Sequence, residues 1–188
     1  MIDSRTRTKI LQAALHHIAL YGEERLSMSG VASEAKVSRG TVYRYFTNRE
    51  ELLDAIALHV RQTFENGVVA AAAEGGDTSE KLDRIVAQRI DPDTRQAVRR
   101  LRELQPAFTL EFLTEHLPEF RKVYARALRD DFDRPDLRLS LDDFVEQLVR
   151  ITVMETLCDL DPEETRRLVV QLWDLTRTAD RSALVETA

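Results

Sequence analysis

The sequence predicts an all-α fold, and three observations support this. Apolar residues recur with the i, i+3, i+4 spacing of amphipathic helices along nearly the whole chain, and no segment shows the alternation of a strand. Polar cap residues and prolines precede many of these stretches, as they do at helix starts. The chain has 188 residues, of which 43% are hydrophobic, which is ample for a buried core.

The N-terminal part divides into short helices separated by clear stops. The first helix should run from about residue 4 to residue 21, where Gly22 is a natural stop. Ser27 suits the N-cap of a second, short helix, because its hydroxyl can accept a hydrogen bond from the first turn. A tight turn at residues 36–37 leads to a third helix capped by Ser38. A short helix, a tight turn and a second helix are the elements of a helix-turn-helix.

The rest of the chain reads as further helices. Asn48 is expected to cap a long helix that ends near residue 73, with Glu51 completing a capping-box-like pair. The stretch 74–79 is the clearest break in the chain. Further helix starts or kinks are predicted from caps and prolines at residue 79, Asp91-Pro92, Gln105-Pro106, Leu117-Pro118, Ser140 and Asp161-Pro162.

The third predicted helix has one apolar face and one polar face. Val42 and Phe46, at i and i+4, form the inward stripe, and Val37 before the cap can staple onto Val42. The opposite face carries Arg39, Gly40, Thr41, Tyr43 and Arg44. Such a face can donate to phosphates and read base edges, and a glycine leaves room for a groove wall.

Charge is unevenly distributed along the chain. Residues 1–50 hold eight Lys and Arg against five acids, whereas the remaining residues hold 19 basic and 28 acidic groups. This asymmetry favours a polyanion-binding head on an acidic body. A solvated surface with chance clustering accounts for it equally well.

With these elements in place, the chain resembles the TetR family of bacterial transcriptional regulators. The resemblance rests on motifs in order between Ile10 and Leu53, namely residues 10–15, 21–22, 31–32, 37–46 and 48–53. It implies a helix-turn-helix DNA-binding domain in residues 1–48 and a helical ligand-binding and dimerisation domain in residues 49–188. The implied partners are a palindromic double-stranded DNA operator, a second copy of the chain and a small-molecule effector.

The function expected from this resemblance is a repressor released from its operator by a ligand. The alternatives are an activator, a regulator without a ligand, or a small-molecule enzyme with a vestigial helix-turn-helix. No catalytic group, metal or cofactor is predicted, because the sequence has no HExxH, CxxC or phosphate-cradling glycine loop. The single cysteine, Cys158, is interpreted as a core residue. Without a long apolar run, the protein is expected to be cytoplasmic.

The DNA-contacting residues are predicted to be Ser27, Ser29, Arg39, Gly40, Thr41, Tyr43, Arg44, Tyr45 and Arg49. The resemblance places Arg39, Gly40 and Tyr43 against bases, and Thr41 and Tyr45 against phosphates. Ser27 and Ser29 lie at the start of the second helix, and Arg49 lies at the start of the long helix capped by Asn48. The resemblance implies that all three contact the DNA backbone.

Three positions depart from the family pattern. Lys36 stands where glycine is common, and a left-handed conformation there would cost roughly 1 kcal/mol. Tyr45 stands where histidine is common and has packing as its alternative role. Gly30 lies inside the second predicted helix.

The predicted body offers less specific candidates. A ligand pocket is expected to involve Phe108, Phe112, Leu113, His116 and Leu117, with ordinary core packing as the alternative. A dimer interface is expected to involve Leu148, Ile151, Leu168, Leu172 and Trp173, with a core within one chain as the alternative. An arginine cluster at 95, 99, 100 and 102 either recognises an acidic ligand or is a solvated face.

Overall fold

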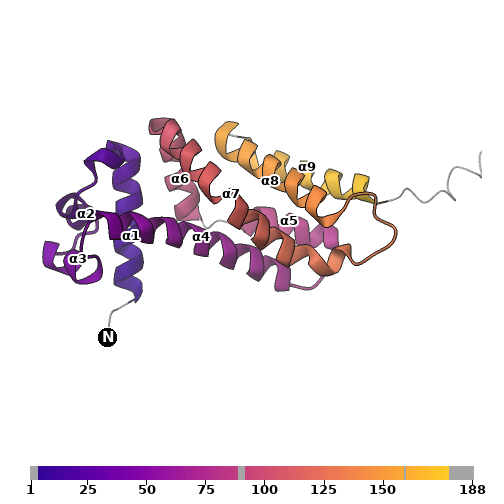
Figure 1. Ribbon diagram of the computed structural model, residues 1–188, viewed down its shortest axis with the longest axis horizontal. Helices are drawn as coiled ribbons and strands as arrows, with labels where there is room; N and C mark the ends of the chain where they lie inside the picture. The colour runs from indigo at the N-terminus through magenta and orange to yellow at the C-terminus, as the bar shows by residue number, and fades with distance from the viewer. Residues whose placement is uncertain (1–3, 89–91, 159, 178–188) are drawn as a thin grey trace, which may run out of the picture. The chain divides into compact units, whose positions relative to one another are not determined.

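The computed structural model describes residues 4–88, 92–158 and 160–177, and within these ranges it is all-α, as predicted (Figure 1). The helices are α1 Ser4–Tyr21, α2 Met28–Glu34, α3 Arg39–Tyr45, α4 Arg49–Ala73, α5 Thr78–Gln88, α6 Pro92–Leu104, α7 Pro106–Leu128, α8 Leu141–Cys158 and α9 Pro162–Thr176. Two short 3-10 helices, Glu23–Arg25 and Arg129–Phe132, complete the described elements.

The described residues divide into two compact units. The first, called here the head unit, comprises residues 4–64 and 92–116, and the second, the body unit, comprises 65–88, 117–158 and 160–177. Both α4 and α7 therefore contribute to each unit. The head unit includes α6, which is distant in sequence from the helix-turn-helix. A functional boundary near residue 48 stays a prediction.

The core of the head unit forms around the apolar stripe of α1. Ile10, Leu11 and Ile18 of this helix are almost fully buried, together with Val31 of α2 and Val42 of α3. The caps predicted for the short helices are present. The Ser27 hydroxyl accepts from the Gly30 amide at 3.1 Å, and the Ser38 hydroxyl accepts from the Thr41 amide at 3.0 Å.

The turn between α2 and α3 closes with a Schellman arrangement. The Lys36 amide donates to the Ser33 carbonyl at 3.1 Å, and the Val37 amide donates to the Ala32 carbonyl at 3.0 Å. Lys36 has a φ of 51°, which is the left-handed region expected for this position. A lysine thus holds a conformation that glycine adopts without strain.

The start of α4 differs from the expected capping box. The Glu51 amide donates to the Asn48 side-chain oxygen at 2.7 Å, so Asn48 is the predicted cap. The Glu51 carboxylate, however, accepts from the amide and hydroxyl of Thr47, at 2.7 and 2.5 Å, and not from the cap residue. These hydrogen bonds from Thr47 favour the ionised form and lower the pKa of the Glu51 carboxyl.

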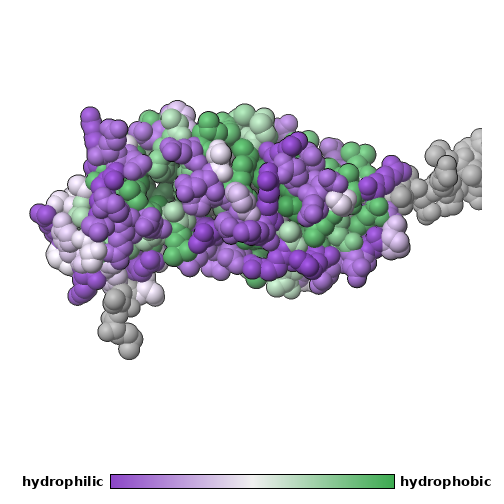
Figure 2. Space-filling view, viewed as in Figure 1, coloured by the Kyte–Doolittle hydropathy of each residue, from purple (hydrophilic) through white to green (hydrophobic). Residues whose placement is uncertain are grey.

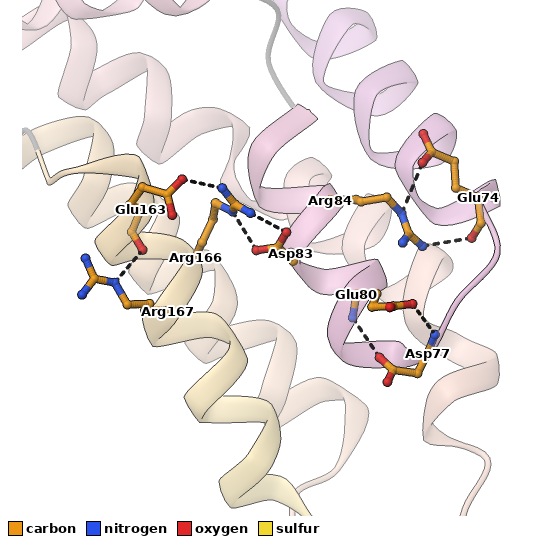
Figure 3. Close-up of polar contacts among 8 residues, drawn as sticks. All are labelled: Glu74, Asp77, Glu80, Asp83, Arg84, Glu163, Arg166 and Arg167. Carbon is orange, nitrogen blue, oxygen red and sulfur yellow. Dashed lines mark hydrogen bonds and ion pairs between the residues drawn. The ribbon is translucent and has the colours of Figure 1, made fainter.

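In the body unit, the start of α5 carries a reciprocal capping box (Figure 3). The Glu80 amide donates to Asp77 at 2.9 Å, and the Asp77 amide donates to Glu80 at 3.1 Å. The sequence Asp77-Thr78-Ser79-Glu80 has the spacing of this motif, so α5 begins at Thr78, one residue before the expected start.

A fork of hydrogen bonds joins α9 to α5. Arg166 donates from two nitrogens to the two carboxylate oxygens of Asp83, at 2.7 and 2.6 Å (Figure 3). This hydrogen-bonded carboxylate raises the pKa of the Arg166 guanidinium above its ordinary value. Arg84, on the same helix as Asp83, donates to the backbone carbonyls of Ala71 and Glu74, at 3.3 and 3.0 Å.

Aromatic rings fill the core of the body unit. Their burial shows that part of the predicted dimer interface was wrong. The Trp173 ring meets Phe144 and Phe132 edge to face, with centroids 5.9 and 5.5 Å apart. Trp173 is 2% exposed and Leu148 is 0% exposed, so both belong to the interior of one chain. Ile151 and Leu172 are half-buried and Leu168 is exposed, so these three remain candidates for a partner-facing surface.

Two smaller expectations from the sequence differ from the structure, and a third concerns a residue that the structure does not describe. Pro118 does not restart a helix, because α7 continues through it. Cys158 is exposed at the end of α8, so its interpretation as a core residue was wrong. Asp91, expected to cap α6, lies outside the described residues.

Across the part of the chain that the structure describes, no helix combines the length and apolarity needed to cross a membrane.

Candidate nucleic-acid interface

The helix α3 presents its polar side chains away from the head core. Val42 is 0% exposed and Phe46, its C-cap, is 1% exposed, so both are core residues as predicted. Arg39, Tyr43 and Arg44 are exposed on the opposite face. The visible face of the helix-turn-helix is mostly hydrophilic or neutral in Figure 2. The geometry therefore leaves one complete helix face available for a partner.

Gly40 lies on this exposed face and has no packing reason to be glycine. A Cβ built at this position would meet only the Ser38 hydroxyl oxygen within 4 Å, at 3.8 Å. Its φ is not in the left-handed region. Packing within the chain therefore does not explain this glycine, and its expected role of leaving room for a groove wall stays a prediction.

Arg39 and Tyr43 form a pair on the surface of α3. The Arg39 guanidinium donates to the Tyr43 hydroxyl at 3.2 Å and lies 5.3 Å from the centre of its ring. The two residues are one helical turn apart, so both side chains rise from the same face. The pairing holds the guanidinium over the helix surface and orients its planar donor fork.

Thr41 and Tyr45 are both half-buried, which limits what they present to DNA. The Thr41 hydroxyl is 2.8 Å from the Ser38 hydroxyl, close to the N-terminus of α3. Tyr45 packs against the head core, and the Arg44 guanidinium lies 5.6 Å from the centre of its ring. Packing, the alternative considered for Tyr45, is thus part of its role.

Arg49 has an intramolecular partner that was not predicted from the sequence. Its guanidinium donates to the backbone carbonyl of Glu23 at 2.8 Å and to the Glu23 carboxylate at 2.9 Å. The Arg49 side chain is 33% exposed, so it still faces solvent on one side. A residue 26 positions away in the sequence carries no local signal of this contact. Arg49 therefore also joins the start of α4 to the 3-10 helix before α2.

Ser27 and Ser29 are exposed at the start of α2, and Gly30 beside them lies close to a side chain of α1. A Cβ at Gly30 would lie 2.6 Å from a ring carbon of His17. The His17 ring is held by a 3.3 Å contact with the Arg25 carbonyl and by Tyr21, 4.7 Å away. The unusual glycine inside α2 thus makes room for a histidine of α1.

Three of the predicted ligand residues, Phe108, Phe112 and His116, form an aromatic row along the part of α7 in the head unit, whereas Leu117 belongs to the body unit. The Phe112 ring stacks on the His116 ring at 4.3 Å and 16°, and the Phe108 ring follows at 6.4 Å. The His116 Nδ1 is 2.9 Å from the Phe112 carbonyl. Phe108 packs against the head core, and Phe112, Leu113, His116 and Leu117 are half-buried. Their ligand-binding role stays a prediction.

Taken together, α2, the left-handed turn and the exposed face of α3 define a helix-turn-helix domain. Residues 10–56 match the family model described as bacterial regulatory proteins, tetR family. The N-terminal part of this chain is therefore a TetR-family domain, and the resemblance expected from the sequence is confirmed.

Curated relatives align with less than half of the chain. The HTH-type transcriptional repressor LfrR of Mycolicibacterium smegmatis is 33% identical over 87 residues, covering 46% of this chain and 45% of that protein. The HTH-type transcriptional regulator TtgR of Pseudomonas putida is 31% identical over 77 residues, covering 41% of this chain and 36% of that protein. The alignments thus span less than half the length of these relatives.

Solved structures share the fold over most of the chain. A TetR-family regulator from Rhodococcus sp. superposes with a TM-score of 0.66 at 20% identity, covering 94% of this chain and 100% of that one. The fatty acid degradation regulator FadR from Bacillus halodurans gives 0.61 at 20% identity, covering 88% and 96%. At this identity the likeness shows the fold alone.

Proposed function

We propose that this protein is a dimeric DNA-binding repressor that a small molecule releases from a palindromic operator. The observation that carries the proposal is the exposed face of α3, on which Arg39 and Tyr43 stand as a pair beside Gly40. The curated relatives named as a transcriptional repressor and a transcriptional regulator support the same class. This function would place the protein in the cytoplasm, with the DNA.

Base reading is assigned to Arg39, Gly40 and Tyr43. An arginine in the major groove can donate both arms of its fork to guanine O6 and N7, which is worth about 1–3 kcal/mol of discrimination. The lack of a side chain at Gly40 lets the helix backbone approach a base edge. Tyr43 supports the guanidinium from one turn away and can itself donate a hydrogen bond.

The remaining predicted contacts are assigned to the phosphates. Arg44 is exposed on α3, and Ser27 and Ser29 are exposed at the start of α2. Thr41, Tyr45 and Arg49 complete this set. A guanidinium has five N–H donors, and a hydroxyl can donate one hydrogen bond while it accepts another, so Arg49 and Thr41 can contact a phosphate and keep their intramolecular partners. Such contacts provide register and most of the salt-dependent affinity, but no sequence choice.

A two-fold dimer would explain how one short helix reads an operator, because two copies double the contacts. The candidate surface lies on α8 and α9, where apolar side chains remain uncovered within one chain. Met154 is 48% exposed, Leu168 is 39% exposed and Leu175 is 73% exposed, and Ile151 and Leu172 lie half-buried with them. Residues 168, 172 and 175 follow helical spacing, so they form a stripe along α9.

The proposed release by a ligand is a population shift. A ligand lowers operator affinity only if it binds better to the state whose head spacing does not fit the operator. Operator and ligand then oppose each other by the same coupling free energy. The α7 row of Phe108, Phe112 and His116, with Leu113, is the candidate for the ligand contact.

Selection of bound DNA from a random pool tests this function. The expected result is an enriched palindrome with two half-sites, and no enrichment beyond non-specific binding would contradict the proposal. Arg39→Ala should then cost about 1–3 kcal/mol at the selected site and relax the preference at one or two base positions. Arg134→Ala, which removes a surface arginine paired with Asp136 in the body unit, is the matched control. A reporter with the operator overlapping or preceding the promoter separates repressor from activator.

A further inference from the structure

One histidine of the head unit joins three helices through both of its ring nitrogens. His16 of α1 places Nδ1 2.6 Å from the carboxylate of Glu34, the last residue of α2. Its Nε2 contacts the guanidinium of Arg100 on α6. Since an arginine only donates, Nε2 must be the unprotonated acceptor and Nδ1 carries the proton toward Glu34. Among the described residues, Glu34 and Arg100 are the charged groups that contact this ring.

Arg100 is a half-buried cation without a carboxylate partner among the described residues. Its hydrogen-bond partner is the uncharged nitrogen of His16, whereas its neighbour Arg99 is paired with Glu103. A guanidinium gains most from an anionic, planar acceptor, which can take two of its N–H groups at once. The guanidinium of Arg100 therefore has unused capacity for an anion.

A cavity of about 180 Å³ opens beside this pair, between α1 and α6 within the head unit. It is lined by Gln12, Leu15, His16, Thr94, Gln96, Ala97 and Arg100. Leu15 and Ala97 give it an apolar wall, the glutamines and Thr94 are neutral, and no acid lines it among the residues whose side chains the structure describes. The volume equals roughly six waters at ~30 Å³ each, which suits a ligand of few heavy atoms.

We propose that this cavity binds a small aliphatic carboxylate, with its oxygens on Arg100 and His16 and its alkyl chain against Leu15 and Ala97. The charge of Arg100 selects an anion, and the apolar wall selects a short hydrocarbon over a bare inorganic ion. This site is separate from the aromatic row of α7, none of whose residues lines the cavity.

Binding of one carboxylate by both Arg100 and His16 requires a proton on Nε2 of His16. In the free protein Nε2 accepts from Arg100, and a carboxylate oxygen in its place cannot donate, so Nε2 must become protonated to bind it. The imidazolium would then donate to Glu34 from Nδ1 and to the ligand from Nε2. Because binding takes up a proton, affinity should rise as the pH falls.

Occupancy of the cavity would reach the helix-turn-helix through Glu34. This glutamate ends α2, two residues before the left-handed Lys36, and its partner changes from a neutral imidazole to an imidazolium. The ion pair would fix the C-terminal end of α2 more firmly to α1. This last step rests on the proposed DNA-binding function, whereas the carboxylate site does not.

Calorimetric titration of the full chain with sodium butyrate tests the site without DNA. We expect saturable binding that takes up a proton, seen as a heat that changes with the ionisation enthalpy of the buffer, and tighter binding at pH 6 than at pH 8. Butylammonium, of equal size and opposite charge, should not bind. Absence of saturable butyrate binding at millimolar concentration, or equal binding of butylammonium, would overturn the proposal.

Two variants localise the binding, and a third variant serves as the control. Arg100→Gln should weaken butyrate at least ~10-fold, because a hydrogen bond to a charged group is lost. Ala97→Leu should block the cavity while keeping both polar groups, which covers the case in which Arg100→Gln disturbs folding. Arg99→Gln should bind like the unaltered chain. Unchanged butyrate affinity in Ala97→Leu, or binding independent of pH, would refute the assignment to Arg100 and His16.

Operator affinity with and without butyrate separates the two proposals. Butyrate bound in the calorimeter with no effect on a selected operator would remove only the link through Glu34. An operator bound normally by a chain that binds no butyrate would leave the proposed function intact and reject this site.

Discussion

Replacing Lys36 by glycine should stabilise the protein, and the size of the effect follows from its backbone. Lys36 has a φ of 51° at the end of α2, where both Schellman hydrogen bonds are formed. The left-handed conformation costs a residue with a Cβ about 1–2 kcal/mol. Glycine removes this strain but gains about 0.4–1 kcal/mol of conformational freedom in the unfolded chain. The net gain in the free energy of unfolding is therefore about 0.5–1 kcal/mol.

Thermal unfolding followed by far-UV circular dichroism measures this difference. For a chain of this size, about 1 kcal/mol corresponds to a change in Tm of about 2–4 °C, so Lys36→Gly should raise Tm by about 1–4 °C. Lys36→Ala is the matched control, because it removes the same charge and alkyl chain but keeps the Cβ and its strain. A lower Tm for Lys36→Gly, or an equal gain in Lys36→Ala, would refute the reasoning.

Three further predictions concern the helix-turn-helix. Gly30→Ala should destabilise the chain despite the better helix propensity of alanine, and His17→Ala in the same chain should recover much of the loss, measured by urea unfolding as a double-mutant cycle. Arg49→Ala should weaken all DNA sequences alike and lower the slope of log Kd against log salt by about 0.9, with an unchanged slope excluding a phosphate contact. The lowered pKa of Glu51 means that its hydrogen bonds stabilise the fold above its ordinary pKa and are lost as the pH falls through the lowered value. Thr47→Val should move the Glu51 pKa back upward in an NMR titration, and no movement would contradict the assigned cause.

Local chemistry made the helix boundaries predictable. A cap such as Ser27, Ser38 or Asn48 acts on amides within three residues, so its effect can be read from neighbouring letters. A left-handed conformation at Lys36 was considered from the family resemblance, because glycine is common at this position of the turn. The Asp77–Glu80 capping box has the same kind of local signal, but Asp77 lies in the stretch 74–79 that was predicted as a break.

Contacts between distant residues were not predictable in this way. An apolar stripe shows that a helix face is covered but not by what, so Trp173 and Leu148 were assigned to a partner chain and lie inside one chain. The pairing of Arg49 with Glu23 depends on how the chain folds back on itself. Similarly, only the tertiary structure shows that His16 of α1 contacts Arg100 of α6.

The interleaving of the two units has a consequence for how this protein is made. The helix-turn-helix leaves the ribosome before α6 does, yet Leu101 of α6 belongs to the core of the head unit and Arg100 of α6 contacts His16. The stretch from residue 65 to residue 116 must therefore be synthesised before the head unit can close. At about 5–20 residues per second, that delay lasts roughly 3–10 s. During those seconds α6 has not yet packed against the apolar face of α1. Chaperone binding to the nascent chain should therefore be strongest before α6 emerges.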